Sequence, residues 1–447
     1  MSSTSNNPAS SKELFGQPIG LYVLFFTEMW ERFSYYGMRA ILVLYLVQST
    51  TEPNAGLGWS NGEALELYGW YTMLVYVASI PGGWIADRVL GQKKAVIWGA
   101  VLLVFGHSIL AIEELWAFYT GLGLIIAGVG MLKPNISTMV GGLYKEGDIR
   151  RDKGFTIFYI GINVGAFLSS LVVGYVGEVY GWHYGFGLAG ICMFLGLLQF
   201  IIGQKHLLGV GDFLGNNQET HTVMKNPLTK IEKDKIAVLV LSFLMVIVFF
   251  GAFEQAGGLM NLYTKEKTNR ILMGWEVPAS WFQSLNAFFI ITLGTLTAGF
   301  WATRKRKKKE ASSLFKMIVG LVIMGLGFLF MTAAALEFES QGSSAMYWLV
   351  FAYLFHTLGE LSLSPVALSF VTKLAPAKYA SLMMGLYFAT TGIGNKIAGI
   401  LGESASEFGE VSIFTAIAFF CILFGIFINL FLKKLKVLTH GAEDQEI

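Results

Sequence analysis

Residues 18–48 read PIGLYVLFFTEMWERFSYYGMRAILVLYLVQ, an apolar stretch long enough to cross a bilayer as a helix. At about 100° per residue, five of its polar residues share one face of that helix: Glu28, Glu31, Arg32, Tyr35 and Arg39. Charges inside a membrane are costly unless they are paired or line water. The stretch therefore predicts a membrane helix whose polar face lines a wet or ion-paired interior.

The composition of the whole chain agrees with a membrane protein. Of its 447 residues, 54% are hydrophobic and 14% are charged, whereas about 25% are charged in soluble domains. The net charge of +2 argues against a nucleic-acid partner. Cys192 and Cys421 stand alone in apolar runs, so we expect no disulfide framework and no metal site. Residues 1–17 lack a signal-peptide core, so we expect the first span to insert uncleaved.

Apolar stretches of membrane-spanning length predict an all-α membrane protein with twelve transmembrane helices. The spans are expected at residues 18–48, 64–86, 95–112, 115–143, 155–177, 184–203, 236–262, 280–302, 313–336, 346–372, 380–402 and 411–432. The polar segment 204–235 divides them into two six-helix bundles, at residues 18–203 and 236–432. Such a division is typical of two-half transporters.

The distribution of Lys and Arg predicts the orientation. The loops after the second, fourth, sixth, eighth and tenth spans hold 20 of these residues, and the other loops hold three. By the positive-inside rule, the basic loops are cytoplasmic. The N-terminal tail 1–17, the linker 204–235 and the C-terminal tail 433–447 are then cytoplasmic too. We expect an inner or plasma membrane, and we interpret the run from Arg304 to Lys309 mainly as a topology signal.

Further polar residues interrupt the other predicted spans. Lys133 stands between Gly130 and Pro134, where a proline frees a backbone carbonyl and glycines allow close approach. Two more polar stripes with four-residue spacing are expected, Tyr159 with Asn163, and His356 with Glu360 and Ser364. A static salt bridge is the alternative interpretation of the first-span charges, and a simple hydrogen bond that of His356.

The loop from Gly83 to Lys94 combines small residues with an acid and a basic cluster. Asp87 can cap a helix or pair with an arginine. We therefore expect Asp87 and Arg88 to form a latch at the cytoplasmic face.

Several of these segments resemble known families. Gly83 to Lys94 resembles the signature loop of the major facilitator superfamily, and Glu28 to Phe33 resembles the E-x-x-E-R-F motif of the proton-coupled oligopeptide transporter (POT) family. Phe158 to Gly165 resembles the F-Y-x-x-I-N-x-G signature of the same family. Matching segments of the second half are Phe253–Gln255, Trp281–Asn286 and Gly359–Pro365. The resemblance covers nearly the whole chain.

The resemblance implies a major facilitator superfamily fold and proton-driven import of di- and tripeptides by alternating access. It implies proton coupling through Glu28, Glu31 and Arg32 with Lys133, and no cofactor other than the proton as coupling ion. We further expect a multi-pass protein that works as a monomer in the lipid bilayer. The long loops hold no Ser/His/Asp set, no Gly-rich phosphate loop and no H-E-x-x-H motif, so we expect that the protein is not an enzyme.

The resemblance also implies a binding site. Arg39 and Lys133 would face the peptide carboxylate, and Glu360, Asn163 and Asn286 would face its amino end. The gate pairs implied are Arg39 with Glu254 on the outside and Lys133 with Glu360 on the inside. The remaining residues implied to line the pocket are Tyr35, Tyr36, Tyr76, Tyr159, Phe250, Ser364 and Tyr387.

The sequence departs from the family pattern at several positions. The linker 204–235 is too short for the two extra spans of many bacterial members. Phe250 and Tyr387 stand where the family usually has tryptophan, and Gly69 stands where animal members carry a histidine. These changes leave the side-chain preference open and place any proton relay on the first-span acids.

Two alternatives remain open from sequence. One is a symporter of nitrate or another organic anion within the same family, although Glu360 would repel a small anion. The other is a peptide sensor that binds without transport.

Overall fold

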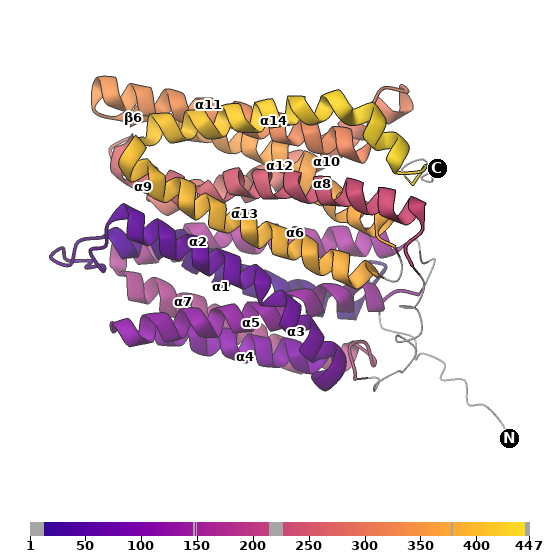
Figure 1. The fold of residues 1–447 in the computed structure, drawn as a ribbon. Coiled ribbons are helices and arrows are strands. Elements are labelled where there is room, and N and C mark those ends of the chain that lie inside the picture. Colours follow the sequence, from indigo (N-terminus) through magenta and orange to yellow (C-terminus); the bar gives the residue numbers. More distant parts are fainter. Residues whose placement is uncertain (1–12, 146–147, 149, 214–226, 377–378, 443–447) are drawn as a thin grey trace. The chain divides into compact units, whose positions relative to one another are not determined.

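A computed structural model describes residues 13–145, 148, 150–213, 227–376 and 379–442. The described chain is dominated by helices (Figure 1). Six long helices precede the linker: α1 (Ile19–Val47), α2 (Asn61–Val77), α4 (Gln92–Leu110), α5 (Leu115–Gly142), α6 (Arg150–Tyr175) and α7 (Trp182–Gly203). Six follow it: α8 (Lys230–Phe253), α10 (Ser284–Arg306), α11 (Ser313–Gln341), α12 (Met346–Leu374), α13 (Ala380–Phe408) and α14 (Glu410–Leu438).

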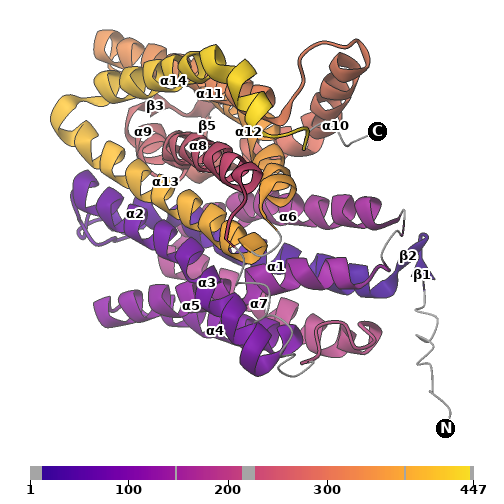
Figure 2. The same cartoon turned by 45° about the vertical axis from the view of Figure 1, so that its right-hand side comes forward.

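Short elements join these helices. The helices α3 (Ser79–Ile85) and α9 (Leu259–Lys267) follow α2 and α8. Three two-stranded pairs are described: β1 (Glu13–Leu14) with β2 (Gln17–Pro18), β3 (Thr268–Asn269) with β6 (Ser344–Ala345), and β4 (Ile271–Leu272) with β5 (Trp275–Glu276). The pair of β1 and β2 is labelled in Figure 2. Only β3 and β6 pair in parallel.

Each predicted span corresponds to a long helix, but two spans are interrupted. The seventh predicted span, 236–262, extends past the end of α8 at Phe253 into α9. The second predicted span, 64–86, divides into α2 and α3 after Val77. Pro81 explains the break, because a proline cannot donate to the carbonyl four residues earlier and its ring clashes there. By length and apolar character alone, nine helices of the described chain can cross a membrane. The long helices outside that set are α1 with its charged stripe, the 17-residue α2, and α13, which is rich in glycine, serine and threonine.

The chain forms two compact units. The first comprises residues 1–38, 78–177 and 182–217, and the second comprises residues 39–77, 178–181 and 218–447. The boundary between them falls inside α1, so the units do not coincide with the halves expected on either side of the linker. In the second unit, α2 packs closely against α13. A Cβ atom added to Gly69 would lie only 2.9 Å from the Cα atom of Gly399, so the glycine allows the two helices to approach. The predicted bundles stay a prediction.

In the first unit, glycines bring α6 against α1. A Cβ atom on Gly165 would lie 2.3 Å from the carbonyl oxygen of Met29, and one on Gly161 would lie 2.8 Å from the Phe25 ring. Small residues four apart allow helices in a membrane to approach closely. Gly161 and Gly165 flank Asn163, so this contact also fixes the position of that side chain relative to the charged stripe of α1.

Gly165→Ala is therefore expected to lower the melting temperature of the purified protein by several degrees, because its methyl group would collide with backbone that cannot move aside. The matched control is Gly123→Ala on α5, where an added Cβ meets no atom within 4 Å. Alanine favours a helix over glycine by up to about 1 kcal/mol, so the control should keep or raise stability. Equal melting temperatures for the two variants would contradict the close-approach argument.

Candidate functional site

The charged stripe of α1 forms a buried ion cluster in the first unit. The Arg32 Nε atom lies 2.9 Å from Glu28 Oε1 and 2.5 Å from Glu31 Oε2. All three side chains are buried, and Glu31 is 0% exposed. The Arg32 guanidinium also lies 5.8 Å from the ring centroid of Tyr35 and 5.9 Å from that of Tyr36. One cation is thus shared by two carboxylates and two aromatic faces.

Lys133 of α5 completes this cluster. Its ammonium interacts electrostatically with Glu28, Glu31 and Arg32. Pro134 cannot donate to the Gly130 carbonyl, and a Cβ atom on Gly82 of α3 would lie only 2.0 Å from that oxygen. The glycine and proline therefore allow α3 to approach α5 next to Lys133. The structure places together the four residues predicted for proton coupling, as two acids and two bases.

Two predicted residues of α6 lie in the same unit. Asn163 is buried, and its Nδ2 atom donates to the Tyr159 carbonyl oxygen at 2.9 Å. The Tyr159 side chain is 43% exposed. The Tyr159 side chain is thus only partly covered, whereas the amide nitrogen of Asn163 is engaged by its own helix.

A second ion cluster lies in the second unit, at Arg39, Tyr68 and Glu254. The Arg39 Nε atom donates to the Tyr68 hydroxyl at 2.7 Å and lies 3.1 Å from Glu254 Oε1. The Tyr68 hydroxyl in turn donates to the same carboxylate oxygen at 2.5 Å. Tyr68 was not singled out by the sequence, because it belongs to no charged stripe or motif, yet its hydroxyl bridges the pair.

Backbone contacts surround this second cluster. Asn261 and Gln283 donate side-chain N–H groups to the Ala40 carbonyl oxygen, at 2.8 and 3.3 Å. A Cβ atom on Gly257 would lie 2.0 Å from the Tyr68 hydroxyl and 2.7 Å from Arg39 Nε. The segment that follows Met38 is thereby joined to residues from the second half of the sequence.

Glu360 of α12 is the centre of a third group, also in the second unit. Its Oε2 atom accepts a 2.7 Å hydrogen bond from Asn286 of α10, whose amide also donates to Thr357. Tyr387 interacts electrostatically with Tyr76 and Glu360. These contacts bring together four of the residues predicted for the binding site, from α2, α10, α12 and α13.

The other predicted residues of this unit are less directly placed. Phe250 packs with Phe249 and Phe253 in an aromatic cluster on α8. The Ser364 hydroxyl is buried without a hydrogen-bond partner among the described residues. His356 packs against Phe328, with ring centroids 4.4 Å apart, and neither of its ring nitrogens has a hydrogen-bond partner among the described residues, so the hydrogen bond expected for it is not seen.

The predicted inner gate pair stays a prediction. Lys133 belongs to the first unit and Glu360 to the second, so the contacts of each residue are given only within its own unit.

The expected cytoplasmic latch is only partly visible. Arg88 stacks over the Trp84 ring at 5.8 Å, and Asp87 has no hydrogen bond or ion pair within the described chain. A different pair ties this loop down, because Lys93 Nζ lies 2.8 Å from Asp212 Oδ1 and its backbone N–H donates to the Gly211 carbonyl. Asp212 lies more than a hundred residues away along the chain, so no local pattern indicated it.

The burial of the ion pair between Arg39 and Glu254 leads to a prediction about the stability of the protein. Glu254→Gln is expected to lower the melting temperature strongly, because removing one member of a buried pair costs about 3–5 kcal/mol. The double variant Arg39→Gln/Glu254→Gln should recover part of this loss, since it leaves no unpaired charge. Thermal unfolding in detergent measures both. A double variant that melts no higher than Glu254→Gln would contradict energetic coupling between the two side chains.

Comparison with known proteins supports the motif assignment. The chain matches the model of the POT family over residues 93–212 and 213–417. It is 36% identical to the uncharacterized transporter YclF of Bacillus subtilis, over 96% of this chain and 97% of that protein. It is 35% identical to the peptide transporter YePEPT of Yersinia enterocolitica, over 89% and 90% of the two chains. It is also 35% identical to a di-/tripeptide transporter of Lactococcus lactis subsp. cremoris, over 95% and 97%.

Solved structures agree in fold. A peptide transporter POT in complex with sulfate superposes with a TM-score of 0.89 at 34% identity, covering 96% of this chain and 97% of that one. A POT family transporter in complex with 5-aminolevulinic acid gives 0.88 at 30% identity, covering 95% and 98%. The chain therefore belongs to the POT family and has a major facilitator type membrane fold, as its sequence motifs predicted.

Proposed function

We propose that the protein imports di- and tripeptides together with protons. The observation that supports this most strongly is the separation of its buried charges into a balanced cluster of acids and bases on α1 and α5 and an acid on α12. Two of its relatives are named as a peptide transporter and a di-/tripeptide transporter. The proton is the coupling ion in this proposal, and the protein acts as a monomer in an inner or plasma membrane with both termini cytoplasmic.

The two ends of a peptide would be bound by groups of opposite charge. Every peptide has one amino and one carboxylate end, so contacts to these ends serve any sequence. We assign the carboxylate to Lys133 and Arg39, and the amino end to Glu360, Asn286 and Asn163. Arg39 is held by Glu254 and Tyr68 here, so its contact with a carboxylate would follow release of that cluster.

Proton coupling would use the shared cation of the first cluster. Arg32 contacts both Glu28 and Glu31. Protonation of one acid would leave Arg32 paired with the other and would give the cluster one excess positive charge, which the carboxylate of a bound peptide would balance. Lys133 would connect this change to the bound carboxylate, because it interacts with both acids.

Alternating access would require the second cluster to break. The residues from Arg39 to Val77 pack in one unit with the second half of the sequence, joined through Glu254 and Asn261. In the predicted orientation this is the outer side. We interpret the arrangement as the outer gate in its closed state, which a ligand would shift by binding one state more tightly.

One relative suggests a broader substrate range. A POT family transporter has been solved with 5-aminolevulinic acid, which carries an amino group and a carboxylate at its ends, as a peptide does. Such a molecule could use the same charged groups of this chain. An anion symporter fits less well, because Glu360 would face the anion.

The function is tested by uptake of labelled dialanine into liposomes that contain the purified protein. With an inward proton gradient and a negative interior, the proposal predicts accumulation that unlabelled tripeptides block. One proton per neutral peptide gains about 2.3 kcal/mol at 100 mV, which corresponds to roughly 50-fold accumulation. Accumulation of nitrate instead of dialanine would favour the anion alternative, and binding without any flux would favour the sensor.

Glu31→Gln is expected to abolish proton-driven accumulation while leaving exchange of labelled for unlabelled peptide. Exchange moves no net proton, so it needs the binding site but not the titrating acid. Both activities are measured in the same liposomes. Equal loss of both would mean that Glu31 is structural.

Lys133→Ala and Glu360→Ala are each expected to weaken peptide binding by at least about tenfold, since each removes the charged partner of one peptide end. Binding is measured by calorimetry on the detergent-purified protein. Lys396→Ala is the matched control, because Lys396 is another lysine within a long helix, and its ammonium lies 4.5 Å from the ring centroid of Trp70. Wild-type affinity in either variant would remove that residue from the site.

A further inference from the structure

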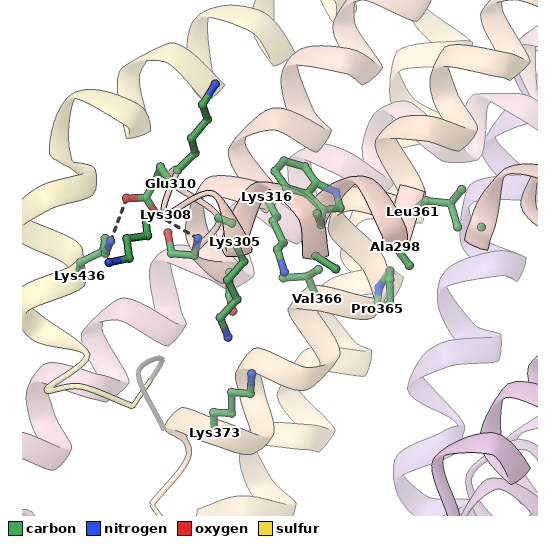
Figure 3. A pocket seen from close by; sticks show the side chains of 17 residues that line it. Ala298, Lys305, Lys308, Glu310, Lys316, Leu361, Pro365, Val366, Lys373 and Lys436 are labelled. Carbon is green, nitrogen blue, oxygen red and sulfur yellow. Dashed lines mark hydrogen bonds and ion pairs between the residues drawn. The ribbon is translucent and has the colours of Figure 1, made fainter. Parts of the chain in front are cut away.

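A basic cavity lies in the second unit, outside the site described above. It has a volume of about 650 Å³ and is lined by α10, the loop that follows it, and parts of α11, α12 and α14. Six lysines and a single acid, Glu310, contribute its charge. In Figure 3 the side chains of Lys305 and Lys373 extend toward the same space from α10 and α12. The lysines are Lys305, Lys308, Lys309, Lys316, Lys373 and Lys436.

Glu310 shows that this cavity stabilises a negative charge. Its carboxylate accepts hydrogen bonds from Lys436 Nζ at 2.9 Å and from the Ser312 N–H at 3.0 Å, at the start of the 29-residue helix α11 (Figure 3). Burial alone would raise the pKa of Glu310, but the hydrogen bonds from Ser312 and Lys436 lower it to about 2. Glu310 is the one acid among the residues that line the cavity, and the side chains of Lys308 and Lys309 form no ion pair within the described chain.

The opposite wall of the cavity is apolar. It is formed by residues such as Ala298, Leu361 and Val366, and by Trp301. Trp301 is 7% exposed, and its indole N–H has no hydrogen-bond partner among the described residues. The same tryptophan also lines a second, apolar groove of about 350 Å³ between α10, α11 and α12.

This groove faces the surface of the unit. Only 17% of the most apolar stretch of α10 is buried, and the groove residues Leu296 and Phe300 are 67% and 56% exposed. The basic cavity and the apolar groove therefore meet at Trp301. If the basic run from Arg304 to Lys309 served only to set the topology, lysines in the loop would be enough. Neither the basic cavity nor the apolar groove would be needed.

We propose that this cavity binds one anionic phospholipid, with its phosphate among the lysines and an acyl chain in the groove between α10, α11 and α12. Basic pockets between membrane helices favour anionic headgroups by charge complementarity. Inorganic phosphate shares the headgroup chemistry, but it cannot use the apolar groove. The proposal is independent of the transported substrate.

The proposal is tested by native mass spectrometry of the full-length protein in detergent with equal amounts of phosphatidylglycerol and phosphatidylcholine. We expect selective retention of one phosphatidylglycerol. The variant Lys305→Gln/Lys316→Gln/Lys373→Gln should weaken this binding by about tenfold or more. The matched control, Lys307→Gln/Lys433→Gln/Lys434→Gln, removes the same charge from neighbouring lysines that do not line the cavity and should bind as the wild type does.

Two further measurements keep the outcome decisive if the triple variant fails to fold. Phosphatidylglycerol with brominated acyl chains should quench tryptophan fluorescence in the wild type and less in Trp301→Phe, whereas inorganic phosphate at equal concentration should not displace it. Equal weakening in the cavity and control variants would overturn the proposal, because binding would then reflect general surface charge. Displacement by phosphate, or quenching unchanged in Trp301→Phe, would overturn the lipid assignment.

Discussion

The contact among Arg39, Tyr68 and Glu254 is the interaction on which the arrangement of the second unit depends. An isolated charge inside a membrane is expensive, so each buried ion must find a partner. Arg39 finds Glu254, with the Tyr68 hydroxyl between them, and these residues come from α1, α2 and the end of α8. The close packing of Gly69 on Gly399 and the hydrogen bond from Asn261 to Ala40 reinforce the same contact. The segment 39–77 is therefore held in one unit with the second half of the sequence.

The first unit uses the same rule in a different way. Its buried cluster has two acids for two bases, and Arg32 is shared between Glu28 and Glu31. In the second unit, Arg39 has a single acid, Glu254, as its partner. Breaking this pair would leave two unpaired charges, so the pair holds the helices together. A cluster with a second acid can accept a proton and keep Arg32 paired with the remaining carboxylate. This difference underlies the proposal that Arg39 and Glu254 gate the site, whereas the Glu28, Glu31 and Arg32 cluster couples the proton.

The sequence predicted the helices and the local clusters well, and predicted long-range contacts poorly. Apolar length gave the twelve long helices, and the spacing of Glu28, Glu31 and Arg32 gave their common face, because both are local properties of a helix. The motifs indicated the POT family, which the comparisons confirmed. The role of Tyr68, the Lys93–Asp212 pair and the interruption of the second span after Val77 were missed. The first two depend on contacts between residues far apart in sequence, and the third depends on Pro81, which interrupts the helix without interrupting the apolar pattern.

In the proposed transport cycle, the contact of segment 39–77 with the second half of the sequence must open. Gly62 of α2 and Ser406 of α13 offer a direct test, because a Cβ atom on Gly62 would lie 3.8 Å from the Ser406 hydroxyl oxygen, so cysteine side chains at these two positions would lie next to each other. In the variant Gly62→Cys/Ser406→Cys, we predict that oxidation cross-links the two helices and stops dialanine uptake into liposomes, and that reduction restores it. Uptake at the wild-type rate by fully cross-linked protein would show that this contact stays closed throughout transport, and would contradict the account.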